Sequence, residues 1–180
     1  MKVSTPADVL AADMAVEWIR TAVHEAGHAV ALAALDLPLH EVWVRLEPVT
    51  KLFGENSWRV RGCAEVAPGG GQVDVEDADT DTWIVATMAG PEAEARWRMR
   101  QEGVWFACTA RSLVAASPYV RGDLDEIRDL LGSRHSTLIR ETAQARTAEL
   151  LGRRWMAVVR VGRALAESGR LTAGDVRGLM

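Results

Sequence analysis

The apolar residues in the first part of the chain recur at the spacing of an α-helix. Val16, Ile19 and Val23 lie three and four residues apart, which places their side chains on one face of a helix. A continuous apolar run follows and ends before Pro38, and proline prevents a helix from continuing. The pattern predicts one helix over residues 8–35.

Two later segments alternate between apolar and polar side chains, as half-buried β-strands do. They run from His40 to Leu46 and from Trp58 to Val66. The piece between them is rich in turn-forming residues around Pro48 and Gly54. The sequence therefore predicts a small sheet built from these two strands.

A helical signal returns after the glycine-rich stretch that follows the second strand. Asp79 or Asp81 can cap a helix over residues 82–100. Because proline lacks the backbone N–H that a helix interior uses, we expect the pair Gly90-Pro91 to interrupt this helix.

The remainder of the chain is also predicted to be helical. A helix is expected to begin near Asp123, and apolar residues at helical spacing then predict one or two long helices that break at Gly152 and end near Ser168. The stretch from Thr172 to Asp175 has the form of a short helix start. The predicted fold class is mainly α with a small β-sheet, an α+β arrangement.

Composition excludes several classes of function. The chain has 21 basic and 25 acidic residues, and this balance argues against a nucleic-acid-binding protein. The apolar runs are too short for a membrane segment, and no phosphate-binding loop for ATP is present. The two cysteines, Cys63 and Cys108, are too few for a disulfide framework, so we expect a cytoplasmic protein.

The strongest chemical signal lies inside the first predicted helix. Residues His24-Glu25-Ala26-Gly27-His28 form an HExxH motif, which uses half of the four histidines of the chain. Histidines four residues apart share one helix face, so both imidazoles can bind one metal ion, and Glu25 can reach a water molecule at that metal. The motif predicts a zinc hydrolase, against the alternative of two unrelated histidines one helical turn apart.

Four segments, the motif included, resemble the zinc peptidase domain of the FtsH-type (AAA metalloprotease) family of ATP-dependent membrane proteases. In order, they are Arg20 to Ala29, the strand pair Val42 to Val44 and Gly62 to Pro68, Met88 to Glu94, and Gly122 to Leu124. The resemblance covers about residues 18–178. The chain departs from the family in having no ATPase domain or membrane anchor, in Pro91, and in lacking the usual Ser-Asn before Asp123.

The resemblance implies a zincin-like fold of the FtsH peptidase-domain type and roles for five residues. His24 and His28 would be zinc ligands, with Asp123 as the third ligand. Glu25 would be the general base of peptide hydrolysis. Glu94 would orient a ligand histidine through its other ring nitrogen.

The residues alone do not identify the third metal ligand. The stretch 122–126 also matches an ordinary helix start, with Asp123 as N-cap and Glu126 three positions later. The two roles are compatible, because a carboxylate has a second oxygen. A gluzincin-like site would use a helical glutamate instead, and Glu94 and Glu92 are its candidates.

The resemblance also indicates an edge strand beside the metal, to which a peptide substrate could add by main-chain pairing. Its residues are Gly62, Cys63, Ala64, Glu65 and Val66. The alternative is an ordinary sheet strand that ends at Pro68. Cys63 is expected to be a packing residue, because no base lies near it in the sequence.

The other distinctive side chains are expected to be structural. Tryptophan buries more apolar surface than any other residue, so the tryptophans are predicted to pack in the core. This set includes Trp43, Trp58, Trp83 and Trp97. His40 and His135 are expected to be surface or capping residues.

From these observations we expect a zinc-dependent metallo-endopeptidase that hydrolyses flexible polypeptides without ATP. Two alternatives remain: a non-catalytic zinc-binding module for partner binding, and a narrow processing protease for one partner protein. Glu25 favours an enzyme, because a structural zinc site does not need it. We expect one domain over residues 1–180, with a metal-site core in 1–132 and a helical part in 133–180.

Overall fold

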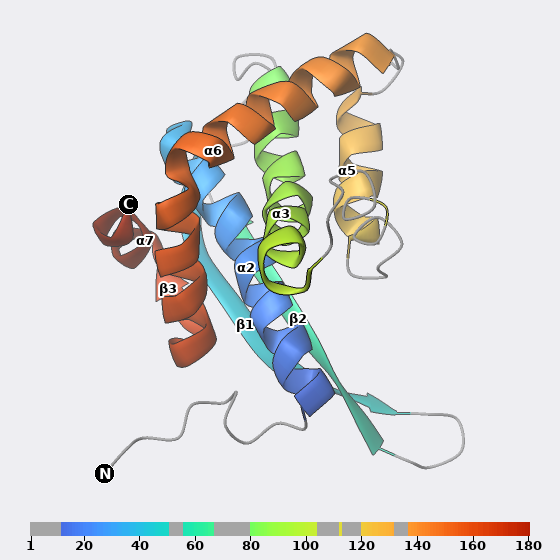
Figure 1. Ribbon diagram of the computed structural model, residues 1–180, viewed down its shortest axis with the longest axis vertical. Helices are drawn as coiled ribbons and strands as arrows, with labels where there is room; N and C mark the ends of the chain where they lie inside the picture. The colour runs from blue at the N-terminus through green and yellow to red at the C-terminus, as the bar shows by residue number, and fades with distance from the viewer. Residues whose placement is uncertain (1–11, 51–55, 67–79, 104–111, 113–119, 132–136) are drawn as a thin grey trace.

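The computed structural model describes residues 12–50, 56–66, 80–103, 112, 120–131 and 137–180 (Figure 1). The elements in chain order are α2 (Ala12–Ala34), β1 (Leu39–Thr50), β2 (Asn56–Val66), α3 (Thr80–Gln101), α5 (Arg121–Leu131), α6 (Thr137–Ser168), β3 (Arg170–Thr172) and α7 (Ala173–Leu179). Helices predominate and the strands form one small antiparallel sheet. The predicted α+β class is confirmed at this level. In the described ranges, no helix combines the length and the apolar character needed to cross a membrane.

The sheet has the strand order β2-β1-β3. β1 and β2 pair along their whole lengths, from Leu39 opposite Val66 to Thr50 opposite Asn56. β3 pairs only with the stretch 41–43 of β1, and its three residues are too few to show an alternation in the sequence. β2 therefore has one strand neighbour and, among the described strands, forms an edge of the sheet.

The turn predicted around Pro48 is wrong. Pro48 lies within β1, opposite Trp58 of β2. Because β3 does not reach this part of β1, the strand has a partner on one side only, where a missing N–H is tolerated. Gly54, the other residue of the predicted turn, lies outside the described residues.

Both predicted helix breaks are also wrong. α3 continues through Gly90 and Pro91, and α6 continues through Gly152. The missing hydrogen bond at Pro91 is offset by the burial of residues on both sides of it, from Ala89 and Gly90 to the run 92–95. Helix-breaking propensity is outweighed here by tertiary packing.

α2 lies at the centre of the molecule, packed against the sheet, α3 and α6 (Figure 1). Its buried positions include Trp18, Ala22 and Ala26, whereas Val16 and Ile19 are exposed. The apolar spacing thus predicted the helix correctly, but of its three spaced residues only Val23 is buried in the core. Small side chains on the buried face allow the backbones of α2 and α3 to approach closely, which brings the HExxH turns against α3.

The C-terminal segment closes the same core. Thr172 is the N-cap of α7 and forms a capping box with Asp175, so the predicted helix start is confirmed. Leu171 and Val176 are buried in the main hydrophobic cluster together with residues of α2 and β1. The principal core therefore draws on both halves of the chain.

The tryptophans differ in environment. Trp83 and Trp97 pack against the main core, as predicted. Trp58 is 56% exposed, so its predicted burial is wrong. Trp43 is half-buried under the guanidinium of Arg45, whose carbon lies 4.1 Å from the ring centroid. His40 is exposed, as expected of a surface residue, while His135 and Cys108 lie outside the described residues.

Candidate metal centre and active site

Successive turns of α2 carry His24 and His28 to one place, as the HExxH spacing predicted. Their Nε2 atoms lie 3.2 Å apart. His24 is buried and His28 is nearly so. Two imidazole nitrogens are therefore directed at one point inside the protein.

Asp123 joins the two histidines from α5. Its Oδ2 lies 2.9 Å from Nε2 of His24 and 3.6 Å from Nε2 of His28. The N-cap role considered for Asp123 is wrong, because α5 already begins at Arg121 and the N–H of Leu124 donates to the carbonyl of Val120. Asp123 thus lies within the first turn of α5 and not at its N-cap.

The three donor atoms fit the dimensions of a zinc site. With metal–ligand distances of about 2.0–2.1 Å, a tetrahedral zinc ion holds its ligand atoms about 3.3 Å apart. The three separations here are 3.2, 2.9 and 3.6 Å. In the described ranges, His24, His28 and Asp123 form the one group of three or more acidic, histidine or cysteine residues able to hold a metal. Two nitrogens and one oxygen form the kind of ligand set that leaves zinc a fourth position.

The Nδ1 atoms of both histidines are already engaged on the opposite side. Nδ1 of His24 lies 3.2 Å from Oε2 of Glu94, and Nδ1 of His28 lies 3.0 Å from the carbonyl of Ala86. Protons on Nδ1 satisfy both acceptors and leave the two Nε2 lone pairs for a metal. Glu94 is itself held by Arg98 at 2.6 and 2.9 Å.

These contacts separate Glu94 and Glu92 from the three donor atoms. Glu94 occupies the Nδ1 side of His24, where it orients the ring, and this position agrees with the role that the resemblance implied. Glu92 pairs with Arg96 at 3.4 Å. The two candidates for a gluzincin-like ligand, Glu94 and Glu92, therefore do not lie at the Nε2 atoms of the histidines. Nothing in the sequence pattern pointed to the roles of Ala86 and Arg98.

Gly90 makes room for the histidines. A Cβ atom at this position would lie 2.1 Å from Nε2 of His28 and 2.7 Å from Nε2 of His24. The backbone of α3 thus passes directly against the two rings, which no other residue would permit. Gly90, part of the pair expected to break the helix, instead leaves room for the two candidate ligand histidines.

Glu25 belongs to α2, its side chain lies against β2, and the residue is 8% exposed. A Cβ at Gly62 would lie 2.4 Å from its Cγ, and the backbone of Ala64 forms a hydrogen bond with its carboxyl group. Burial raises the pKa of Glu25, although His24 and His28 oppose this effect. A carboxyl group with a raised pKa is a stronger proton acceptor, as a general base requires.

The charges of the centre are arranged to hold a cation. Burial alone would raise the pKa of Asp123, but the adjacent His28 and His24 hold it well below its usual range. Burial likewise lowers the pKa of His24, yet its hydrogen bonds to Asp123 and Glu94 raise it to about 10. Carboxylates from α2, α3 and α5 therefore surround the two imidazoles and favour a positive charge among them.

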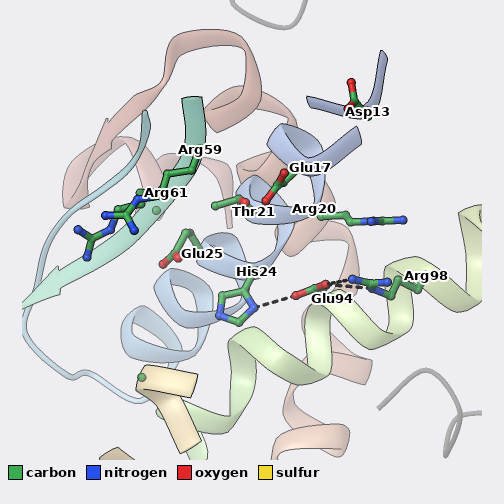
Figure 2. A pocket seen from close by; sticks show the side chains of 12 residues that line it. Asp13, Glu17, Arg20, Thr21, His24, Glu25, Arg59, Arg61, Glu94 and Arg98 are labelled. Atoms are coloured by element: carbon green, nitrogen blue, oxygen red, sulfur yellow. Dashed lines mark hydrogen bonds and ion pairs between the residues drawn. The ribbon is translucent and has the colours of Figure 1, made fainter. Parts of the chain in front are cut away.

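Two cavities flank Glu25 along β2. The larger, of about 760 Å³, lies between β2 and the first turns of α2 (Figure 2). The smaller, of about 200 Å³, is bounded by the end of β2 together with α3 and α5. Gly62 and Glu25 line both cavities, so β2 runs past Glu25 from one cavity to the other.

The remaining residues of the proposed substrate strand lie in β2. Cys63, Ala64 and Val66 line the smaller cavity, and Glu65 accepts a hydrogen bond from the indole of Trp43. Burial raises the pKa of Cys63 to about 11, which makes the thiol a poor nucleophile at neutral pH.

No protein-family model matches the chain, and no curated protein matches its sequence.

Proposed function

We propose that this protein is a zinc-dependent metallo-endopeptidase that cuts flexible polypeptides without ATP. The observation that carries the proposal is the convergence of His24, His28 and Asp123 within zinc-ligand distances, next to the buried carboxyl group of Glu25. The proposed fold is zincin-like, of the FtsH peptidase-domain type. It is supported by a helical HExxH motif, an edge strand beside Glu25 and an acidic ligand on a later helix.

The residues of the candidate site would have different roles in hydrolysis. His24, His28 and Asp123 would hold the metal, while Glu94 and the carbonyl of Ala86 fix the ring orientations. When bound, zinc supplies a Lewis acid that polarises a carbonyl group and lowers the pKa of water. Glu25 accepts a proton from the attacking water and donates it to the leaving amine.

The substrate is proposed to bind as an added strand on the edge of β2 that has no strand partner among the described residues. Main-chain hydrogen bonds to a strand edge require an extended chain, which flexible segments supply and folded proteins do not. Cavities on both sides of Glu25 accommodate chain before and after the cleaved bond, so the enzyme acts within a polypeptide rather than at its end. The two cysteines of the chain fit the cytoplasmic location that belongs to this proposal.

Glu25 also argues against a purely non-catalytic zinc module. It is not among the three candidate ligands, and its burial destabilises its charged form. A site that used zinc only for stability would gain nothing from such a carboxyl group.

The test combines metal analysis with digestion of an unfolded protein. We expect about one zinc per chain, chelator-sensitive cleavage, and a Glu25→Gln variant that keeps its zinc but loses at least about 100-fold in rate, as removal of a general base does. Glu149→Gln, an exposed change on α6, is the matched control and should retain full activity. Absence of zinc would refute the metal site, and cleavage by Glu25→Gln at the wild-type rate would refute the mechanism.

A further inference from the structure

Charged residues of opposite sign line the larger cavity beside Glu25. Asp13 and Glu17 line it from α2, and Arg59 and Arg61 line it from β2 (Figure 2). Asp13 and Glu17 are four residues apart on one side of the helix, and neither forms an ion pair with any described residue. The α2 wall therefore carries two uncompensated negative charges.

The β2 wall carries an excess of positive charge. Glu47 of β1 is shared by three guanidinium groups, those of Arg45 at 2.9 Å, Arg59 at 3.1 Å and Arg61 at 3.3 Å. One carboxylate cannot balance three cations, so about two positive charges remain. The side chains of Arg59 and Arg61 are 49% and 51% exposed, which leaves them accessible to a ligand.

Apart from His24 and Glu25 of the candidate site, the other charged residues that line this cavity are compensated. Nε of Arg20 lies 2.5 Å from Glu102, and Arg98 pairs with Glu94 at 2.6 Å and with Glu102 at 3.8 Å. These two cations and two carboxylates cancel. The uncompensated charge is thus divided between α2, which is negative, and β2, which is positive.

The alternation of β2 determines which wall a bound chain would meet. Val60 is fully buried and Gly62 lies against Glu25, so the even-numbered residues face α2, while Arg59 and Arg61 lie on the opposite face of the strand. A chain added to the edge of β2 would continue this alternation. Its side chains would point alternately toward Asp13 and Glu17 and toward Arg59 and Arg61. Opposite charges on adjacent strands attract and like charges repel.

We propose that this groove selects extended polypeptide segments in which basic and acidic side chains alternate, on the side of the cleaved bond that lies along residues 58–61. Basic side chains contact Asp13 and Glu17, and acidic side chains contact Arg59 and Arg61. The inference rests on the proposed peptidase function and narrows its substrate class from any flexible chain to one with this charge pattern. It accounts for charged groups that peptide hydrolysis itself does not need.

Three peptides that share one central segment test the pattern. One carries alternating Lys and Glu on one flank, the second has the same pattern shifted by one residue, and the third has Gln at these positions. We expect the alternating peptides to be cleaved with a kcat/KM about fivefold above the Gln peptide, since exposed ion pairs are individually weak. The one-residue shift should move the cleaved bond by one residue, because it exchanges the two faces of the strand. Equal rates and an unmoved bond would overturn the proposal.

Two variants test whether the charged residues of α2 and β2 cause the preference for alternating peptides. Glu17→Gln should remove most of the preference for Lys, and Arg61→Gln most of the preference for Glu. Glu149→Gln, with the same loss of charge on the exposed side of α6, should retain both preferences. Raising the salt concentration should weaken the preferences of the wild type, because exposed charges are screened. Unaltered preferences in both groove variants would contradict the assignment.

A binding measurement distinguishes a failure of this inference from a failure of the proposed peptidase function. Fluorescence anisotropy of the labelled peptides measures association without any cleavage. Tighter binding of the alternating peptide by the wild type, lost in Glu17→Gln, would support the groove even if no peptide were cut. Cleavage of all three peptides at equal rates and at the same bond, with equal binding, would overturn the charge selection and leave the peptidase intact.

Discussion

Gly90 connects the packing of α3 to the metal centre. Because a Cβ there would lie 2.1 Å from Nε2 of His28, Gly90→Ala must push the imidazole out of position. We expect a loss of zinc affinity of at least about tenfold, since displaced ligands weaken metal binding at least as much as lost supporting contacts do. Titration against a chromogenic chelator measures it.

The matched control is Gly152→Ala on α6. Its nearest neighbour would be a terminal nitrogen of Arg96 at 3.6 Å, an ordinary contact. This variant should keep full zinc affinity and gain stability of up to about 1 kcal/mol from the better helix propensity of alanine. Equal zinc affinity in the two variants would contradict the position assigned to Gly90.

The third ligand is decided by substitution at Asp123. Asp123→Asn removes the negative charge at Oδ2, so zinc affinity should fall strongly, whereas Glu94→Gln weakens the orientation of His24 and should cost about 10- to 100-fold at most. Asp125→Asn, an exposed change on the same helix, should leave the affinity unaltered. Full affinity in Asp123→Asn with metal loss in Glu94→Gln would instead transfer the ligand role to Glu94.

At the scale of elements, β2 lies close enough to α2 to fix the position of Glu25, the proposed general base. A Cβ at Gly62 would lie 2.4 Å from Cγ and 2.7 Å from Oε1 of Glu25. Gly62→Ala should therefore displace the general base without touching a metal ligand. We expect kcat to fall by about tenfold or more while zinc content stays at the wild-type level. Wild-type kcat in this variant would show that Glu25 does not act from its observed position.

The end of the chain carries a pH-dependent element in α7. The carboxylate of Asp175 accepts hydrogen bonds from the hydroxyl and the backbone N–H of Thr172, at 2.7 and 2.8 Å, and these bonds lower the pKa of Asp175. A carboxyl group with a lowered folded pKa stabilises the fold above its unfolded pKa of about 3.9 and loses this contribution as the pH falls through the folded value.

Asp175→Ala should accordingly unfold at a lower denaturant concentration than the wild type at neutral pH. The difference between the two proteins should shrink as the pH falls below about 4, because the wild-type carboxyl group then becomes protonated. Denaturant titrations at a series of pH values measure both midpoints. A difference that grew toward low pH would contradict the sign of the pKa shift.

For the whole molecule, the proposed metal ties together elements that are far apart in the chain. His24 and Asp123, which come from α2 and α5, are 99 positions apart. A ligand that binds only the folded state stabilises it by about 4 kcal/mol when present at 1,000 times its Kd. We expect a chelator to lower the Tm of the wild type and to leave that of Asp123→Asn nearly unchanged, as followed by thermal unfolding. An identical wild-type Tm with and without zinc would contradict this link.

The elements that could be predicted are those whose signals lie within a few neighbouring residues. The helical face spacing of His24 and His28, the alternation in β1 and β2, and the capping pattern of Thr172 and Asp175 each depend on short-range geometry. Turns of a helix and alternate faces of a strand follow from backbone periodicity alone. Local sequence was therefore sufficient for the type of these elements and for two of the three candidate metal ligands.

The remaining features depend on contacts between distant segments. α3 and α6 continue through Pro91 and Gly152 because burial outweighs local propensity, and β3 exists because Arg170–Thr172 finds β1 as a partner. Resemblance to a known family pointed to Asp123, but its approach to His24 follows from the packing of α5 on α3 and of α3 on α2. These contacts form because burial of the whole core lowers the free energy of the folded state. A short window of neighbouring residues does not carry that information.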